Sequence, residues 1–347
     1  MKKANLIYLL GSILFAVLIG FSSCTKEGPA GPAGADGEDG IDGTDGTATC
    51  IQCHDDSQNL FAKINQWEHS VHAIGGNYER NEGECAICHT SQGFLGNLDG
   101  SYDYTAEGAF ISDPNPPNCY TCHKIHDTYT PEDLALTKTD PVELNNTAKA
   151  TFDFGKANLC ASCHQGRTVD PFPVENGGDY NVTNSRFGVH HGPQANTFAG
   201  MGLFEVGSGY NNHVHTNIAD ACVTCHMTEP FGAQAGGHTM NISYEYHGAT
   251  ELNLNGCTEC HSDPDALAEN TEELQAEVEE LLAELQALLI DAGIYNENTG
   301  LANTGTYSSN VAGAFLNYMA IEEDRSLGVH NPTYIKKILQ NSIAAIE

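Results

Sequence analysis

Helical periodicity of hydrophobic and polar positions is strongest in the last quarter of the chain. A long amphipathic helix is predicted to begin within residues 262–265, where the sequence SDPD places Pro264 in the first turn, and to end at Gly293. Its heptad phasing is typical of a helix whose apolar face packs against another helix. The apolar stripe alternates spacings of four and three residues and consists of Leu274, Val278, Leu281, Leu285 and Leu288.

Two further amphipathic runs follow, one over residues 311–321 and one that starts at Asn331 and Pro332. Residue Asn270, with Glu273 three positions later, is a second possible start of the first helix. Upstream, residues 127–155 contain two prolines that punctuate the chain, and the long stretch between residues 164 and 222 is rich in glycine and asparagine. Both stretches are predicted to be mostly loop.

The first 24 residues have the layout of an export signal. Two lysines precede an apolar run over residues 4–21, and the sequence FSSC follows. FSSC resembles the lipobox of bacterial lipoproteins, in which the cysteine is lipidated after cleavage. We therefore predict a signal peptide over residues 1–23, a lipid anchor on Cys24, and an exported protein held at the outer membrane, facing the periplasm or the cell surface. An uncleaved membrane helix is the alternative, because the apolar run is near the lower spanning limit.

Glycine recurs at every third position from Gly28 to Gly46. This phasing is collagen-like, but the run is short for a triple helix and its many acidic residues repel one another. We therefore predict that residues 24–49 form a solvated tether. Trimerisation, or calcium binding through the aspartates, is the alternative interpretation.

Six copies of the pentapeptide Cys-x-x-Cys-His stand between residues 50 and 261. This is the attachment site of c-type haem, in which both thiols form thioethers with the porphyrin and the histidine coordinates the iron. Six covalent haems c are therefore predicted, with thioethers at Cys50, Cys53, Cys85, Cys88, Cys119, Cys122, Cys160, Cys163, Cys222, Cys225, Cys257 and Cys260. The predicted first axial ligands are His54, His89, His123, His164, His226 and His261.

Zinc sites and a disulfide framework are the two alternatives for so many cysteines. Paired CxxC units also build tetrahedral zinc sites, although such sites seldom carry a histidine directly after every second cysteine. A disulfide framework gives no reason for the recurring histidine. Thirteen cysteines minus the twelve motif thiols leave only Cys24, so no pair remains for a disulfide within the chain.

The chain is strongly acidic, with a formal net charge of −32 over its 347 residues. Cleavage of the signal would remove two lysines and no acidic residue, so the mature charge would be −32 minus 2, which is −34. This charge argues against nucleic acid and anionic membrane surfaces as partners, and it favours redox partner proteins with a basic docking surface. Solubility alone is the alternative explanation of the charge.

Ten histidines remain outside the motifs, since sixteen minus six is ten, which suffices to give every iron a second axial histidine. His126 follows its motif by three residues and is well placed to ligate a neighbouring haem. The stretches SVHA, HHGPQ and GHT resemble segments that supply axial ligands in exported multihaem cytochromes. That resemblance implies His72, His191 and His238 as ligands, with His190 in reserve for His191.

Less information is available for the other histidines. His215 is a weaker ligand choice, preferred over its neighbour His213. His69 shares a helix face with His72 and is either a ligand or a surface residue, and His247 is predicted to lie at the surface.

The end of the chain, with DRSLGVHNP before the last helix, resembles the C-terminal helices of the pentahaem nitrite reductase group. By that resemblance His330 is an axial ligand delivered from the tail, and the long helix is a packing or dimerisation surface that could make a homo-oligomer. A cap on the last helix is the alternative role for His330. The nitrite reductases mark their catalytic haem with lysine in place of the motif histidine, and none of the six motifs here has that lysine.

The predicted fold is mainly α with extensive loop and almost no sheet. Residues 50–261 would wrap around six haems, with about 35 residues for each haem, too few for a separate protein core. Residues 262–347 would form a helical tail. The leading function is an electron carrier between a membrane or periplasmic donor and a terminal reductase or extracellular acceptor. The alternatives are a reductase of nitrite, hydroxylamine or another small oxyanion at one open haem, and a haem-bearing filament.

Overall fold

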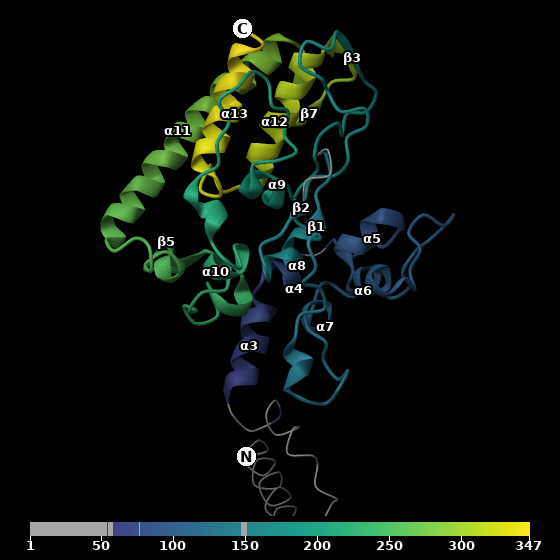
Figure 1. The fold of residues 1–347 in the computed structure, drawn as a ribbon, viewed down its shortest axis with the longest axis vertical. Coiled ribbons are helices and arrows are strands. Elements are labelled where there is room, and N and C mark those ends of the chain that lie inside the picture. The colour runs from purple at the N-terminus through teal and green to yellow at the C-terminus, as the bar shows by residue number, and fades with distance from the viewer. Residues whose placement is uncertain (1–53, 55–57, 76, 147–150) are drawn as a thin grey trace, which may run out of the picture. The chain divides into compact units, whose positions relative to one another are not determined.

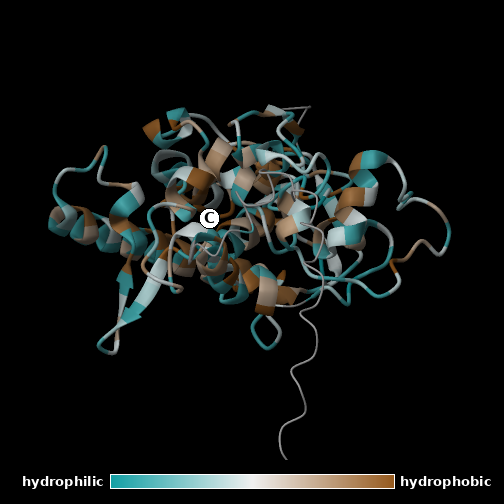
Figure 2. Cartoon of the chain, turned by 90° about the horizontal axis from the view of Figure 1, so that it is seen from below, coloured by the Kyte–Doolittle hydropathy of each residue, from teal (hydrophilic) through white to brown (hydrophobic). Residues whose placement is uncertain are grey.

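The computed structural model describes residues 54, 58–75, 77–146 and 151–347 (Figure 1). The predicted signal peptide, the lipidation site Cys24, the tether, and the first two motif thiols, Cys50 and Cys53, lie outside these residues. In the part that is described, no helix is both long and apolar enough to cross a bilayer. Figure 2 shows hydrophobic and hydrophilic residues interleaved along the helices.

Short helices joined by loops make up the motif-bearing region. Side-chain caps limit several of them: the Thr90 hydroxyl accepts from the amide of Gly93 at the start of one helix, and Asn118 forms a capping box at the start of another. The α-helices are α3 (Gln58–Glu68), α4 (Val71–Ile74), α5 (Gly83–His89), α6 (Ser91–Asp99), α7 (Cys119–Cys122), α8 (Ala157–Ala161), α9 (Gln194–Ala199) and α10 (Cys222–His226). The 3-10 turns are η1 (Pro131–Leu134), η2 (Val214–Asn217), η3 (Gly237–Thr239) and η4 (Leu254–Gly256).

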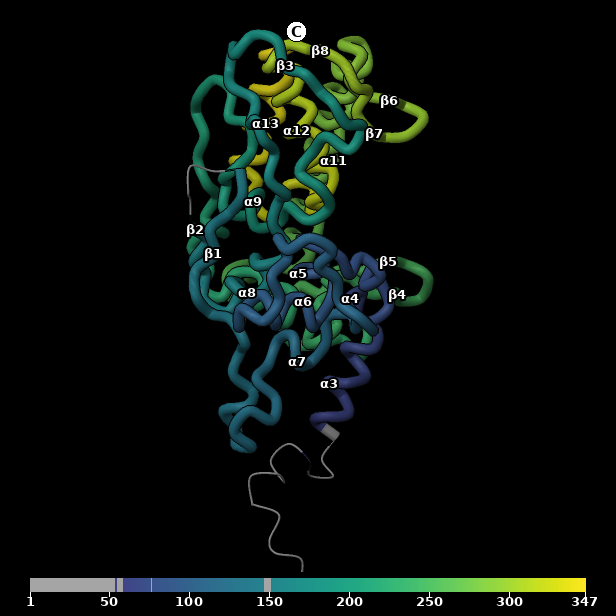
Figure 3. Tube along the Cα trace, turned by 90° about the vertical axis from the view of Figure 1, so that its right-hand side faces the viewer, coloured from purple at the N-terminus to yellow at the C-terminus, as the bar shows by residue number. Residues whose placement is uncertain are grey.

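Strands occur only as short antiparallel pairs in the described chain, which agrees with the expectation of little sheet. The pair of β3 with β8 joins the long stretch before the fifth motif to the tail (Figure 3). In its register, Tyr180 lies opposite Tyr307. The pairs are β1 (Val142–Glu143) with β2 (Thr151–Phe152), β3 (Asp179–Val182) with β8 (Gly305–Ser308), β4 (Ser243–Tyr246) with β5 (Ala249–Leu252), and β6 (Tyr295–Asn296) with β7 (Leu301–Ala302).

Three long helices form the tail, as the periodicity predicts: α11 (Pro264–Asp291), α12 (Ser309–Asp324) and α13 (Pro332–Ala344). Asp263 caps α11 by accepting from the amide of Ala266, and Asn331 caps α13 in the same way. Gly293 follows the end of α11 with a φ of 78°, a conformation that glycine adopts without strain. The helix runs unbroken through Asn270, so the second possible start is not used.

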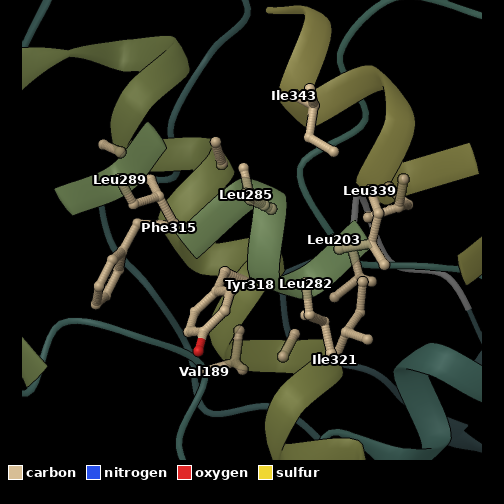
Figure 4. Packing of buried hydrophobic residues seen from close by; sticks show 14 of the residues in the cluster. Val189, Leu203, Leu282, Leu285, Leu289, Phe315, Tyr318, Ile321, Leu339 and Ile343 are labelled. Atoms are coloured by element: carbon tan, nitrogen blue, oxygen red, sulfur yellow. The ribbon is translucent and has the colours of Figure 1, made fainter. Parts of the chain in front are cut away.

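The buried face of α11 differs in part from the predicted apolar stripe. Val278 and Leu285 of that stripe are fully buried in the core with α12 and α13, whereas Leu274, Leu281 and Leu288 are only partly buried. Leu282 and Leu289, which the prediction did not include, complete the buried face (Figure 4). The stretch before the fifth motif contributes Val189 and Leu203 to the same cluster. The stripe therefore packs within the molecule, and an oligomer through the C-terminal helices stays a prediction that would need another face.

Candidate haem-iron sites

Each motif histidine faces a second histidine from elsewhere in the chain. The six ring pairs have centroid separations between 6.0 and 6.5 Å. The pairs are His54 with His126 at 6.1 Å, His89 with His190 at 6.4 Å, His123 with His238 at 6.3 Å, His164 with His72 at 6.0 Å, His226 with His330 at 6.3 Å, and His261 with His215 at 6.5 Å.

This separation fits two imidazoles on opposite faces of one iron. A metal–imidazole bond is about 2.0 Å and the bound nitrogen lies about 1.1 Å from the ring centre, so two such ligands in line place their ring centroids about 6.2 Å apart. Direct packing between the rings would leave them closer, as in the contact of His213 with His215 at 4.4 Å. The residues present therefore fit six haems with two histidine ligands each.

Hydrogen bonds at Nδ1 orient many of these rings so that Nε2 is left for the metal. The Nδ1 atom of His123 lies 2.7 Å from the carbonyl of Leu134, and that of His226 lies 2.9 Å from the carbonyl of Met240. With the proton assigned to Nδ1, the ring donates to these acceptors and its Nε2 lone pair is free. The remaining Nδ1 partners are Val329 O for His215 at 2.9 Å, Gln194 Oε1 for His164 at 3.2 Å, Met240 Sδ for His72 at 3.1 Å, and Asp324 Oδ1 for His330 at 2.7 Å.

Burial keeps several of the paired histidines in the neutral form that can ligate a metal. Burial, together with the nearby His164, lowers the pKa of His72 to about 4. Burial also lowers the pKa of His190 to about 4, with additional contributions from the Arg167 cation and neighbouring histidines. His330 differs: burial would lower its pKa, but the charge of Asp324 and the hydrogen bond to it raise the pKa overall.

In the second and fifth motifs, a single helical turn brings the motif residues to one face. In α5, Cys85, Cys88 and His89 occupy positions i, i+3 and i+4, which share a helix face. Helix α10 holds the fifth motif in the same way, from Cys222 to His226. Local helix formation thus converts the sequence spacing into a common direction for two thiols and one imidazole.

Several motifs lie against one another. The Cys88 sulfur lies 4.0 Å from the carbonyl of Ser162, and the Cys163 sulfur lies 3.9 Å from the carbonyl of Ile87, so the second and fourth motifs abut. The thiols of Cys160 and Cys222 interact as well, and α8 contacts α10. The fourth motif therefore stands beside both the second and the fifth.

Exposed apolar side chains flank the paired histidines. Val71 and Ile74 on α4 are 69% and 73% exposed on either side of His72, and Val214 is 67% exposed beside His215. All the large hydrophobic residues with exposed side chains in the described chain lie between residues 61 and 246, and none lies in 262–347. These surfaces suit the apolar faces of a porphyrin, which would cover them.

The structure favours His190 over the predicted His191 as the partner of His89. His190 lies opposite His89, whereas His191 points to α12, where its Nδ1 lies 2.5 Å from the Glu323 carboxylate. His190 has a φ of 67°, and this left-handed turn directs the two neighbouring rings to different partners. Sequence alone offers two adjacent histidines without a signal that separates them.

The other extra histidines stay outside the six pairs. The Nδ1 atom of His69 lies 2.7 Å from the carbonyl of Asn65, in its own helix. His213 packs on His215, and His247 packs on Tyr246 at a ring distance of 4.2 Å. The Arg167 guanidinium donates to the carbonyl of Arg186 over 3.2 Å.

Comparison with solved structures finds the outer cell wall cytochrome OcwA, to which this chain is similar with a TM-score of 0.50 and 20% identity. The fold is that of a multihaem cytochrome. The match covers 82% of this chain and 50% of OcwA, so the chain spans half the length of that cytochrome. An undecahaem cytochrome from the S-layer of Carboxydothermus ferrireducens is similar with a TM-score of 0.40 and 18% identity, over 80% of this chain and 40% of that one. No protein-family model matches the sequence, and no curated protein matches it.

Proposed function

We propose that this chain is an exported hexahaem c-type cytochrome that carries electrons between a membrane or periplasmic donor and a terminal reductase or extracellular acceptor. The observation that carries the proposal is the pairing of all six motif histidines with a second histidine at one common separation. Bound haem supplies one-electron exchange between ferric and ferrous iron.

The chain's own side chains favour electron transfer over chemistry at an open iron. The motif thiols would hold the haems, and the paired histidines would be the ligands of each iron. With two imidazoles bound to it, an iron would leave no position for water or a small oxyanion. Because the fourth motif abuts the second and the fifth, neighbouring cofactors would lie close enough for electrons to pass between them.

A place outside the cell membrane follows from the N-terminal sequence. A cleaved signal over residues 1–23, lipidation of Cys24 and an acidic tether would hold the haem region away from an outer membrane. The name of OcwA puts that protein in the outer cell wall, which supports an exported setting here. The charge of −32 would attract a redox partner with a basic docking surface.

Haem quantification and low-temperature EPR of the purified oxidised protein test this function together. Six haems per chain and only low-spin ferric signals are expected, because each iron would have two imidazole ligands. One high-spin iron in six would contradict the electron-carrier proposal and support the alternative, a reductase of nitrite, hydroxylamine or a similar oxyanion, to be assayed directly.

Adjacent histidines provide matched controls for the ligand assignment. His190→Ala and His72→Ala should each convert one iron in six to the high-spin form, since each removes one axial imidazole. His191→Ala and His69→Ala should leave every iron low-spin, because neither ring belongs to a pair. A high-spin signal in His191→Ala but not in His190→Ala would overturn the assignment at His89.

A further inference from the structure

The Nδ1 of His330 lies beside a carboxylate. It donates to Asp324 Oδ1 over 2.7 Å, and the Asp324 side chain is completely buried. The corresponding acceptors of His123, His215 and His226 are neutral backbone carbonyls. His164 has a neutral side-chain amide and His72 a thioether sulfur. A full negative charge at its acceptor therefore distinguishes His330 from these other histidines.

Two hydroxyl groups hold the carboxylate in place. Thr197 donates to Asp324 Oδ1 over 2.5 Å, and Ser326 donates to Oδ2. Among the described residues, the ionic partner found for Asp324 is His330. The carboxylate is thus positioned by neutral donors, and little else in its surroundings offsets its charge.

We propose that Asp324 lowers the reduction potential of the haem held by His226 and His330, an inference that rests on the proposed function. The hydrogen bond from Nδ1 to a carboxylate raises the basicity of the imidazole, which stabilises ferric iron more than ferrous iron. Burial strengthens the effect because water does not screen the charge. Asp324 acts through His330 and is a positioning residue.

The end of α12 gives two neighbouring sites different acceptors. The Gln194 amide donates to the carbonyls of Glu323 and Asp324, over 3.2 and 3.5 Å, and its oxygen accepts from His164. One helix terminus therefore presents a neutral acceptor to one axial ligand, through Gln194, and a carboxylate to another. The haem of His164 and the haem of His226 would therefore differ in reduction potential, because Gln194 is neutral and Asp324 is charged.

Redox titration of the full holoprotein, followed by EPR and visible absorption, tests the inference. Asp324→Asn should raise the reduction potential of one haem in six by at least about 59 mV, which is a tenfold change in the equilibrium constant for one-electron reduction. The potentials of the other five haems should not change. The asparagine can be accommodated, because the Ser326 hydroxyl can turn and accept from the new amide. Glu323→Gln is the matched control, since Glu323 contacts His191 outside the pairs, and it should shift none.

A second variant gives the opposite sign and does not depend on Asp324→Asn folding. Ser326→Ala removes one donor from the carboxylate, leaves more charge for His330, and should lower the same component. The inference is overturned if Ser326→Ala shifts no component downward, or if Asp324→Asn folds with six low-spin haems and shifts none upward. Fewer than six haems, or a high-spin iron, in the wild-type protein would instead count against the proposed function itself.

Discussion

Residues 262–347 bury their hydrophobic side chains, whereas residues 54–261 leave many of theirs exposed. In the tail, helices α11, α12 and α13 pack on one another, and most of the larger hydrophobic cluster comes from them. Between residues 58 and 123, only Ala86 and Phe94 are buried hydrophobic residues among those described. The same stretch contains large exposed side chains such as Phe61, Val71 and Phe110. Residues 262–347 therefore have a core made of protein side chains, whereas residues 54–261 expose apolar surface that porphyrins would cover.

The difference indicates two sources of stability in one chain. Apolar side chains that pack on each other contribute to folding without a cofactor. A motif region with few such contacts has little to offset the entropy of ordering its loops unless porphyrins fill the space. The two regions nevertheless meet, because β3 pairs with β8, His330 lies opposite His226, and the carbonyl of Val329 lies 2.9 Å from Nδ1 of His215.

The largest effect should come from withholding haem. The chain from residue 24 onward, produced where no haem is attached, should keep slow amide exchange in α11, α12 and α13 and lose it in α5, α7 and α10. The reason is that only the tail helices bury their apolar stripes against protein. Hydrogen-exchange mass spectrometry measures this, with the haem-loaded protein as the reference. Equal protection in both regions of the haem-free chain would contradict the comparison.

Within the tail, truncating a buried leucine should be the most damaging single change. Leu285 on α11 is fully buried, so Leu285→Ala should lower the free energy of unfolding by about 2–5 kcal/mol. Glu284→Ala, one position earlier on the exposed face, is the matched control and should change it by less than about 0.5 kcal/mol. Chemical denaturation followed by far-UV circular dichroism gives both values, and similar losses in the two variants would refute the assignment of the stripe to the core.

The two regions also differ in how far sequence could predict them. Helices α11, α12 and α13 follow from their periodicity and from their caps at Asp263 and Asn331, since local signals and burial agree there. In the motif region the pentapeptides indicate the first ligand of each haem by spacing alone. The second ligand depends on which distant segments meet, and no local pattern carries that information.

The second ligands show this limit at particular residues. His330 lies opposite His226, about a hundred positions away in the chain, and family resemblance alone suggested it. His190 and His191 have identical side chains, and the left-handed backbone conformation of His190 determines which ring lies opposite His89. Asp324 was missed altogether, although a carboxylate six residues before a predicted ligand is a signal that could have been examined.

Acid should weaken the haem region before it affects the carboxylates. The folded pKa of His72 is about 4, below its ordinary 6.5, because the ring is buried. Its contribution is complete above pH 6.5 and decreases as the pH falls below that value, since the unfolded chain takes up the proton while the folded ring stays neutral. Hydrogen bonds from Lys156 lower the pKa of Asp220, so protonation of this carboxylate reduces stability only below pH 3.8, its ordinary pKa. The denaturant concentration at the midpoint of unfolding, followed by haem absorption, should therefore decrease as the pH is lowered from 7 to 4.5. An increase over that range would contradict the assignment.

The smallest effect should come from the surface ion pair between two tail helices. Lys336 on α13 lies 3.1 Å from Glu277 on α11, with 33% and 48% of the two side chains exposed. Water and salt screen such a pair, so a double-mutant cycle with Lys336→Met and Glu277→Gln should give a coupling of about 0.2–1 kcal/mol. Because the Debye length is about 3 Å at 1 M salt, the coupling should disappear there. A larger coupling that persists in high salt would mean that ionic contacts, as well as the buried stripe, hold α11 against α13.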